Sequence, residues 1–305
     1  GVGYSAQPPG AQAMKIAIAS GKGGTGKTTV SAALADIWPT PVLAMDLDVE
    51  APNLQLFLNP ELTGGETATM AVPVVDESRC TYCRACAELC QFKAISVLGS
   101  GVLTFPEMGH GCGGCWDICP EGAITQGRRE LGEIRWGTFS NGDFLEGRLR
   151  IGEAMSPPLM RLVKATAAAQ FQTAEPDMII DAPPGVSCPA VNAAMDNDVI
   201  ILVTEPTPFG VYDLQLAHEA FSALDTPMGV VVNRAGLGDG GVYDYCRRAG
   251  LPILAEIPHQ RRLAEAYARG GLVTSVSDDI KRTFVDLSRK AVALQKAPAV
   301  QAVGQ

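Results

Sequence analysis

Hydrophobic residues gather in short continuous runs that alternate with segments of helical periodicity. The runs are KIAIAS from Lys15, then PVLAMDLD, MIIDAP, VIILVTEP, GVVVNRA and PILAEIP. Helical patterns occupy residues 29–38, 208–224 and 261–269 between them. Strands that are apolar throughout and alternate with helices are typical of a parallel sheet covered on both faces. The pattern therefore predicts an α/β fold with a doubly wound, mostly parallel sheet.

Two stretches depart from this alternation. Residues 1–13 lack periodicity, and we interpret them as a tag or flexible tail. Between about Pro52 and Gly152 the alternation stops, and the sequence SNGD at 140–143 predicts a hairpin turn. We therefore predict a small α+β domain at residues 73–127, inserted after the second strand of a main domain that comprises residues 14–72 and 128–305.

Composition and charge exclude several classes of protein. With 47% hydrophobic residues the chain can bury a sizeable core, so wholesale disorder is excluded. The formal net charge of −9 argues against a broad nucleic-acid interface, which needs clustered Lys and Arg. No apolar run approaches the roughly 20 residues of a membrane helix, and no signal peptide is evident. We expect a soluble, cytoplasmic protein without stable membrane insertion.

The C-terminal segment contains a stripe of apolar residues at helical spacing, namely Ile280, Phe284, Leu287, Ala291 and Leu294. Such a stripe is compatible with a membrane-surface helix, but packing onto the sheet is the more common use of it. We therefore predict a C-terminal helix that covers the sheet.

A glycine-rich loop joins the first predicted strand to the first helix. Its sequence GKGGTGKT fits the phosphate-binding pattern GxxxxGKT in the strand–loop–helix context that the pattern requires. Glycines let backbone N–H groups surround phosphates, the lysine at the end of the loop reaches the outer phosphates, and the following threonine can bind Mg²⁺. We predict that ATP or ADP with Mg²⁺ binds at Gly21, Lys22, Gly23, Gly24, Thr25, Gly26, Lys27, Thr28 and Thr29.

The string KGGTGKT resembles the loop of the MinD/ParA/nitrogenase-iron-protein superfamily, whose members are SIMIBI-type P-loop ATPases. The resemblance continues in MDLDVEAPN, MIIDAPPG and VVNRA. It implies an acidic pair at Asp46 and Asp48, a further acidic residue at Asp181, and a contact of Asn233 with the nucleotide base. In this superfamily the early lysine, here Lys22, crosses a dimer interface to the nucleotide of the partner.

The resemblance also implies a mechanism, in which ATP lies between two subunits of a homodimer or of a heterodimer with a similar ATPase. Thr28, Asp46 and Asp181 form the expected Mg²⁺ site, and Asp48 orients the attacking water. Lys27 and the Lys22 side chain of the other subunit neutralise the charge that develops during phosphoryl transfer. Catalysis is therefore expected from Lys22, Lys27 and Asp48.

Seven of the nine cysteines lie in the predicted insert. The spacing of Cys80, Cys83, Cys86 and Cys90 is C-x2-C-x2-C-x3-C, as in bacterial ferredoxins, with Gln91 where proline usually follows. Zinc is the alternative, but zinc sites normally use two separated pairs of ligands. A copy follows at a constant offset along the chain, which maps Cys83, Cys86 and Cys90 onto Cys112, Cys115 and Cys119.

This internal repeat resembles the two-cluster ferredoxin, in which each copy lends its last cysteine to the other cluster. The resemblance implies a complete 4Fe-4S ligand set of Cys80, Cys83, Cys86 and Cys119. The second set has only Cys90, Cys112 and Cys115, because the same offset maps Cys80 onto Gly109.

Three outcomes follow for this second site. It can hold a 3Fe-4S cluster, it can hold a 4Fe-4S cluster whose fourth iron takes His110, water or an exogenous ligand, or it can stay empty.

Two cysteines lie outside the insert. Cys188 follows Asp181 by seven residues, an offset similar to that of a cluster-binding cysteine in the nitrogenase iron protein. It is a possible cluster ligand, with packing in the loop as the alternative. Cys246 lies in a helical pattern and is expected in the core.

The chain as a whole resembles MinD-superfamily ATPases that carry an inserted ferredoxin domain. The leading prediction is an Mg²⁺-dependent ATPase that couples a dimer switch to electron transfer through ferredoxin clusters. One alternative is an Mrp-like ATPase that assembles or carries clusters, although the C-terminal CPxC of that type is absent. Another is a MinD/ParA-like positioning ATPase with redox-sensing clusters.

A redox or cluster-acceptor protein is the expected partner. The insert carries six acidic and three basic residues between Asp76 and Ile124. We therefore expect this partner to present a basic patch.

Overall fold

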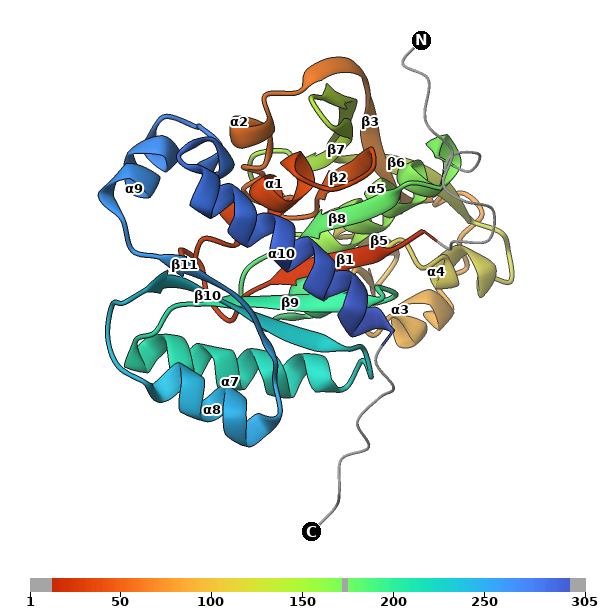
Figure 1. Ribbon diagram of the computed structural model, residues 1–305. Coiled ribbons are helices and arrows are strands. Elements are labelled where there is room, and N and C mark those ends of the chain that lie inside the picture. The colour runs from red at the N-terminus through yellow and green to blue at the C-terminus, as the bar shows by residue number, and fades with distance from the viewer. Residues whose placement is uncertain (1–12, 172–174, 297–305) are drawn as a thin grey trace.

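A nine-stranded sheet forms the centre of the molecule, which we describe from a computed structural model of residues 13–171 and 175–296 (Figure 1). The strand order is β11-β10-β9-β1-β8-β2-β7-β6-β3. The seven strands from β11 to β7 are parallel to one another. Their bounds are β1 Lys15–Ala19, β2 Val42–Asp46, β7 Gly142–Leu149, β8 Asp177–Asp181, β9 Val199–Thr204, β10 Met228–Ala235 and β11 Ile253–Pro258.

Helices cover both faces of this sheet, as the alternation of apolar runs predicts. One face packs against α1 (Lys27–Asp36) and α10 (Asp278–Gln295), with α2 (Gln55–Leu58), α9 (Arg261–Ala268) and the 3₁₀ turn η2 (Val273–Ser275) beside them. The other face packs against α5 (Ser156–Gln170), α6 (Cys188–Ala194), α7 (Pro208–Ser222) and α8 (Gly241–Ala249). The predicted doubly wound α/β fold is confirmed.

The expectation for the C-terminal helix is also confirmed. Ile280, Phe284, Leu287 and Ala291 are buried on α10, with at most 3% of each residue exposed. The helix crosses the sheet in the foreground of Figure 1 and packs against α1 and β11. Within the part of the chain that the structure describes, no helix combines the length and the apolar content that a membrane crossing requires.

The edge of the sheet differs from what the sequence predicts. Strands β3 (Glu61–Val75) and β6 (Ile124–Phe139) pair antiparallel over almost their whole length, and β6 pairs antiparallel with β7. The region around residues 52–152 therefore contributes three strands to the main sheet. The hairpin predicted at SNGD is confirmed, because Phe139 and Gly142 form the last pair between β6 and β7.

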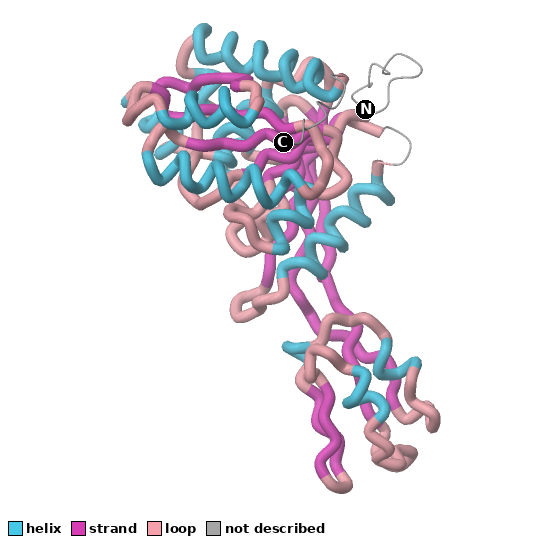
Figure 2. Tube along the Cα trace, turned by 90° about the horizontal axis from the view of Figure 1, so that it is seen from below, coloured by secondary structure: helices cyan, strands magenta, loops and turns pink. Residues whose placement is uncertain are grey.

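A smaller lobe lies at the far end of the β3–β6 ribbon, as Figure 2 shows. It contains α3 (Ala85–Leu89), α4 (Gly114–Asp117), the 3₁₀ turn η1 (Pro106–Met108) and a two-stranded sheet of β4 (Ile95–Leu98) and β5 (Gly101–Thr104). The predicted boundaries of the insert, at residues 73 and 127, fall inside the ribbon strands. The ribbon is thus shared by the lobe and the main sheet.

The backbone of this lobe confirms the internal repeat. Helices α3 and α4 begin at equivalent positions of the two copies, and each follows a residue in the left-handed region. The Phe105 amide donates to the Ala94 carbonyl (2.8 Å), and the equivalent bond joins the Asp76 amide to the Ala123 carbonyl (2.7 Å). Positive φ angles also recur at equivalent positions, namely at the pairs Tyr82 and Gly111, Arg84 and Gly113, and Lys93 and Gly122.

Phe144 of β7 provides a test of how the sheet is held together. Its side chain is fully buried in the core between the sheet and α1. We expect Phe144→Ala to lower the free energy of unfolding by about 3–5 kcal/mol, because a large cavity replaces the ring. Leu98→Ala is the control, since Leu98 is 63% exposed and its loss is expected to cost under about 0.5 kcal/mol. Urea denaturation followed by circular dichroism measures both; equal effects would contradict this description of the core.

Candidate functional site

Asp181, the last residue of β8, organises the loop between β1 and α1. Its fully buried carboxylate accepts hydrogen bonds from Lys27 Nζ (2.8 Å), Thr28 Oγ1 (2.7 Å) and Ser31 Oγ (2.7 Å). The structure thus brings together three residues that the sequence assigns to phosphate and Mg²⁺ binding. Ser31 is a further donor that the sequence motif does not include. It reaches Asp181 because it lies one turn after Lys27 on α1.

The loop itself requires glycine at two positions. Gly24 and Gly26 have φ angles of 81° and 92°, which lie in the left-handed region. A Cβ atom on Gly26 would lie 2.2 Å from Asn233 Nδ2, so any other residue would displace that side chain as well as strain the backbone. The loop is followed directly by α1, whose N-terminal amides favour an anionic ligand.

Asn233 lies beside this loop, at the end of β10. Its Nδ2 donates to the Thr25 carbonyl (2.7 Å). It also lines a cavity of about 370 Å³ between the loop, β11 and α9, whose wall includes Gly24, Gly26 and Thr29. Asn233 thus holds the glycine-rich loop and lies on the wall of the cavity beside it.

Asp46 and Asp48 follow β2 next to Asp181. The Asp46 carboxylate is fully buried and accepts from the amides of Asp48, Asn53 and Leu54, each at 2.9 Å. Burial and the nearby Asp181 charge raise the pKa of Asp46 well above its usual range. Its oxygens therefore hold the backbone of the following loop, in addition to the Mg²⁺ role predicted for it.

A row of charged side chains extends from this point across the sheet to the ribbon. Asp46 is in register with Asp181 on one side and with Glu146 of β7 on the other. Glu146 is buried and forms an ion pair with Arg135 of β6. Arg135 also donates to the Gln55 side chain (3.4 Å), one residue beyond the loop that Asp46 holds. The sequence gives no signal for this row, since its members come from four separate segments.

Lys22 is held within its own subunit. Its Nζ lies 2.7 Å from Glu205 Oε1 and 3.5 Å from Asp213 Oδ2. Hydrogen bonding to Glu205 raises the pKa of Lys22. Glu205 also pairs with Arg234 (2.8 Å), which in turn donates to the Gly24 carbonyl (3.2 Å). Sequence reasoning missed Glu205, although it follows β9 at the same edge of the sheet as the glycine-rich loop.

The cysteines of the lobe line two cavities. Cys80, Cys83, Cys86 and Cys119 line the first, of about 20 Å³, which we call site 1. Cys90, Cys112 and Cys115 line the second, of about 280 Å³, which we call site 2; Cys86 also touches its wall. Burial, with a smaller effect of the neighbouring Cys119 and Cys80, raises the pKa of the Cys86 thiol.

The thiols of both sites are the kind of donor that holds an iron–sulfur cluster, whereas the cavity at site 1 is too small for one. Backbone amides donate to Cys80 Sγ (3.4 Å), Cys90 Sγ (3.3 Å) and Cys119 Sγ (3.3 Å), as sulfurs bound to iron commonly require. Among the described residues, no three His, Cys, Asp or Glu side chains are gathered closely enough for one metal ion. A cavity of about 20 Å³ holds about one water molecule, so a cluster at site 1 requires its loop to move outward.

Gly109 and His110 both lie on the wall of site 2. The Gly109 amide donates to the Pro106 carbonyl (3.2 Å), and the equivalent bond in the other copy joins the Cys80 amide to the Glu77 carbonyl (3.3 Å). Gly109 therefore takes the place that Cys80 takes in the other copy. The His110 ring stacks on Phe92, with 3.6 Å between ring centroids and 13° between planes.

The remaining two cysteines have different surroundings. Cys188 is exposed and is the first residue of α6, directly after the loop that follows Asp181. Cys246 is buried on α8, with 2% of the residue exposed, as the sequence predicts.

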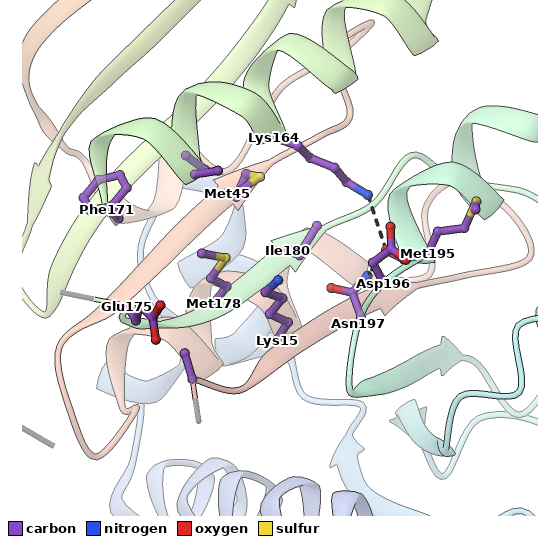
Figure 3. A pocket seen from close by; sticks show the side chains of 13 residues that line it. Lys15, Met45, Lys164, Phe171, Glu175, Met178, Ile180, Met195, Asp196 and Asn197 are labelled. Atoms are coloured by element: carbon purple, nitrogen blue, oxygen red, sulfur yellow. Dashed lines mark hydrogen bonds between the residues drawn. The ribbon is translucent and has the colours of Figure 1, made fainter. Parts of the chain in front are cut away.

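A further cavity, of about 430 Å³, lies away from both groups. Lys15 at the start of β1 and Lys164 of α5 line it together with Met45, Met178 and Asn197 (Figure 3). The glycine-rich loop follows the opposite end of β1, so this cavity does not belong to the phosphate site. Lys164 donates to the Asn192 carbonyl (2.8 Å), and burial lowers its pKa.

Residues 16–273 match the family described as the CobQ/CobB/MinD/ParA nucleotide binding domain. The chain belongs to this family. Its members share the strand–loop–helix arrangement described above, and nucleotide binding is assigned to this chain on that basis.

Similar proteins include an uncharacterized protein of Methanocaldococcus jannaschii, 33% identical over 90% of this chain and 96% of the relative. An iron–sulfur cluster carrier protein of Pyrococcus abyssi is 24% identical over 91% of this chain and 85% of the relative. The solved MinD protein of Pyrococcus horikoshii, complexed with Mg-ADP, has the same fold, with a TM-score of 0.57 and 20% identity over 94% of this chain and 99% of that chain.

The pKa of Asp48 leads us to expect that the stability of the protein depends on pH. Burial raises its pKa from 3.8 to about 6, so the folded state binds a proton more tightly than the unfolded state between these values. Stability from this group therefore falls as the pH rises from 4 to 7. Relative to Asp48→Asn, we expect the metal-free, nucleotide-free protein to lose about 1 kcal/mol over this range, after allowing for solvent screening.

Urea denaturation at pH 4.5, 5.5 and 7 measures this difference. Asp225→Asn, at an exposed position on the surface, is the matched control and is expected to show no trend with pH. A constant difference between the parent protein and Asp48→Asn would contradict the raised pKa.

Proposed function

We propose that the protein is a dimeric, Mg²⁺-dependent ATPase that couples its nucleotide cycle to electron transfer through iron–sulfur clusters in the lobe. One observation carries this proposal: the nucleotide site and the cysteine-containing lobe are both attached to one continuous sheet. Asp181 and Lys27 lie at one end of the charged row, and the ribbon that leads to the cysteine-containing lobe lies at the other.

On the nucleotide side, this chain's residues have defined tasks. Lys27 neutralises the outer phosphates, Thr28 and Asp181 hold Mg²⁺ with the help of Asp46, and Asp48 orients water. Glycine amides of the loop surround the phosphates, and Asn233 contacts the base. Mg²⁺ supplies charge stabilisation for the transferred phosphoryl group.

Lys22 links the nucleotide cycle to dimer formation. In this proposal it leaves Glu205 and Asp213 and reaches the nucleotide of the other subunit. Breaking two ion pairs with partly exposed partners costs little, because such pairs contribute about 0–1 kcal/mol each. The pairs within the subunit therefore hold Lys22 away from the interface without preventing the exchange.

In the lobe, Cys80, Cys83, Cys86 and Cys119 hold a 4Fe-4S cluster at site 1, and Cys90, Cys112 and Cys115 hold the cluster of site 2. The clusters supply one-electron chemistry. Amide donors to the sulfurs tune their potentials. The acidic surface of the lobe favours a redox partner with a basic patch.

Cluster carriage is the second candidate, and the likeness to the cluster carrier protein favours it. Site 1, however, takes ligands from both copies of the repeat, so releasing its cluster requires the lobe to open. This arrangement supports a resident cluster, and we therefore prefer electron transfer.

The cross-interface role of Lys22 has a direct test. We expect Lys22→Ala to lower the ATP turnover rate at saturating ATP by about 100-fold, because a cation that stabilises the transition state is lost. Affinity of the monomer for ADP should change less than threefold, about 0.6 kcal/mol. Lys281→Ala, on the exposed side of α10, is the control. Normal turnover and normal dimerisation of Lys22→Ala would reject the role.

Whether the clusters stay in the protein or leave it distinguishes electron transfer from cluster carriage. Anaerobically purified protein is reduced with dithionite, freed of excess reductant and mixed with cytochrome c, with or without Mg-ATP. We expect Mg-ATP to accelerate cytochrome c reduction by about tenfold, which corresponds to an activation barrier lower by about 1.4 kcal/mol, with iron retained. Lys27→Ala is the control that should lose the acceleration. Transfer of iron and sulfide to an apo-ferredoxin on ATP addition would favour carriage instead.

A further inference from the structure

We propose that site 2 is a ligand-binding site, in which one iron of its cluster is open to the cavity and binds a small thiolate from outside the chain. This inference rests on the proposed function, because it assumes that clusters occupy the lobe. It adds the position of the open iron and the chemistry of what binds there.

The first support is the missing ligand itself. Gly109 lines the same cavity as Cys90, Cys112 and Cys115, and it occupies the turn that Cys80 occupies in the other copy. Cys86 lines both cavities, and the crossed pattern of the repeat assigns it to site 1, which leaves three thiols for site 2. The position that lacks a ligand has a defined place, on the wall formed by Gly109.

The second support is the difference in volume between the two sites. The cavity at site 1 is about 20 Å³, whereas that at site 2 is about 280 Å³. The two copies share their backbone turns and helices, so local sequence accounts for the difference. Of the two sites, site 2 therefore has the larger space beside its thiols.

The lining of the cavity indicates the class of ligand. Leu89, Phe92, Ile95 and Trp116 present apolar surface, and His110 is the titratable side chain on the wall apart from the thiols. A thiolate on a short carbon chain suits both the apolar wall and iron, for which soft sulfur ligands are favoured.

His110 is the internal competitor for the open position. Its ring is stacked face to face on Phe92, which holds it against the cavity wall. In our proposal it stays in that stack and leaves the iron free. His110→Ala therefore keeps both the cluster and its response to thiol.

The chain offers a matched pair of variants. A Cβ atom at Gly109 meets only the Pro106 carbonyl oxygen at 3.5 Å and Ala94 Cβ at 3.8 Å, which are ordinary contacts. Its φ of −73° and ψ of 137° suit any residue. Gly109→Ala adds the carbon alone, whereas Gly109→Cys adds the carbon and the missing thiol.

The experiment uses the full chain, purified anaerobically, with 2-mercaptoethanol as the probe. Iron and sulfide are quantified, and EPR spectra of the reduced protein are recorded during a thiol titration. We expect one of two cluster signals to shift in the parent protein, in Gly109→Ala and in His110→Ala. In Gly109→Cys the signal should already resemble the all-cysteine form, and its thiol affinity should fall at least tenfold.

The outcomes separate this inference from the function on which it rests. A 3Fe-4S signal at site 2, an unchanged titration in Gly109→Cys, or loss of the second cluster in His110→Ala would overturn the open iron and leave the clusters in place. Absence of iron from every variant under full reconstitution would instead overturn the proposed function, and the inference with it.

Discussion

The buried carboxylate of Asp181 is the interaction on which the nucleotide site depends. It lies at the end of β8, the strand between β1 and β2, and it gathers Lys27, Thr28 and Ser31 onto one acceptor. A carboxylate with no exposed surface is stable there only because cationic and hydroxyl donors surround it. The start of α1, and with it the glycine-rich loop, is therefore fixed by a residue that lies far later in the chain.

The need of a buried carboxylate for polar partners also explains why charged side chains follow one another across the sheet. Asp46 lies beside Asp181 and cannot share its donors, so it is satisfied by three backbone amides of the loop before α2. Glu146 comes next in register and forms an ion pair with Arg135 of the ribbon through one of its two carboxylate oxygens. Each buried acid has its own partners, and those partners belong successively to α1, to the loop before α2 and to β6.

Several parts of this arrangement follow from sequence, and others do not. The apolar runs predict the parallel strands, and the regularly offset cysteines predict a repeat that the φ angles confirm. The ribbon was missed because β3 is an edge strand with mostly exposed residues at its start, so it lacks an apolar pattern. The contacts of Lys22 with Glu205, and of Arg135 with Glu146, join distant segments. No local pattern can predict such pairs, since tertiary structure alone brings them together.

The ribbon also determines where the lobe lies relative to the nucleotide site. Pairing of β3 with β6 shifts register between Leu62 and Gly64 and again between Ala68 and Thr69. Shifts of this kind bend and twist a strand pair. Both lie before the distal part of the ladder, which leads to the lobe and is held by its own hydrogen bonds. Arg135, which forms the ion pair with Glu146, lies opposite Gly65 between the two shifts. The irregular part of the ribbon is therefore the part that contacts the charged row, and the regular part is the one that bears the lobe.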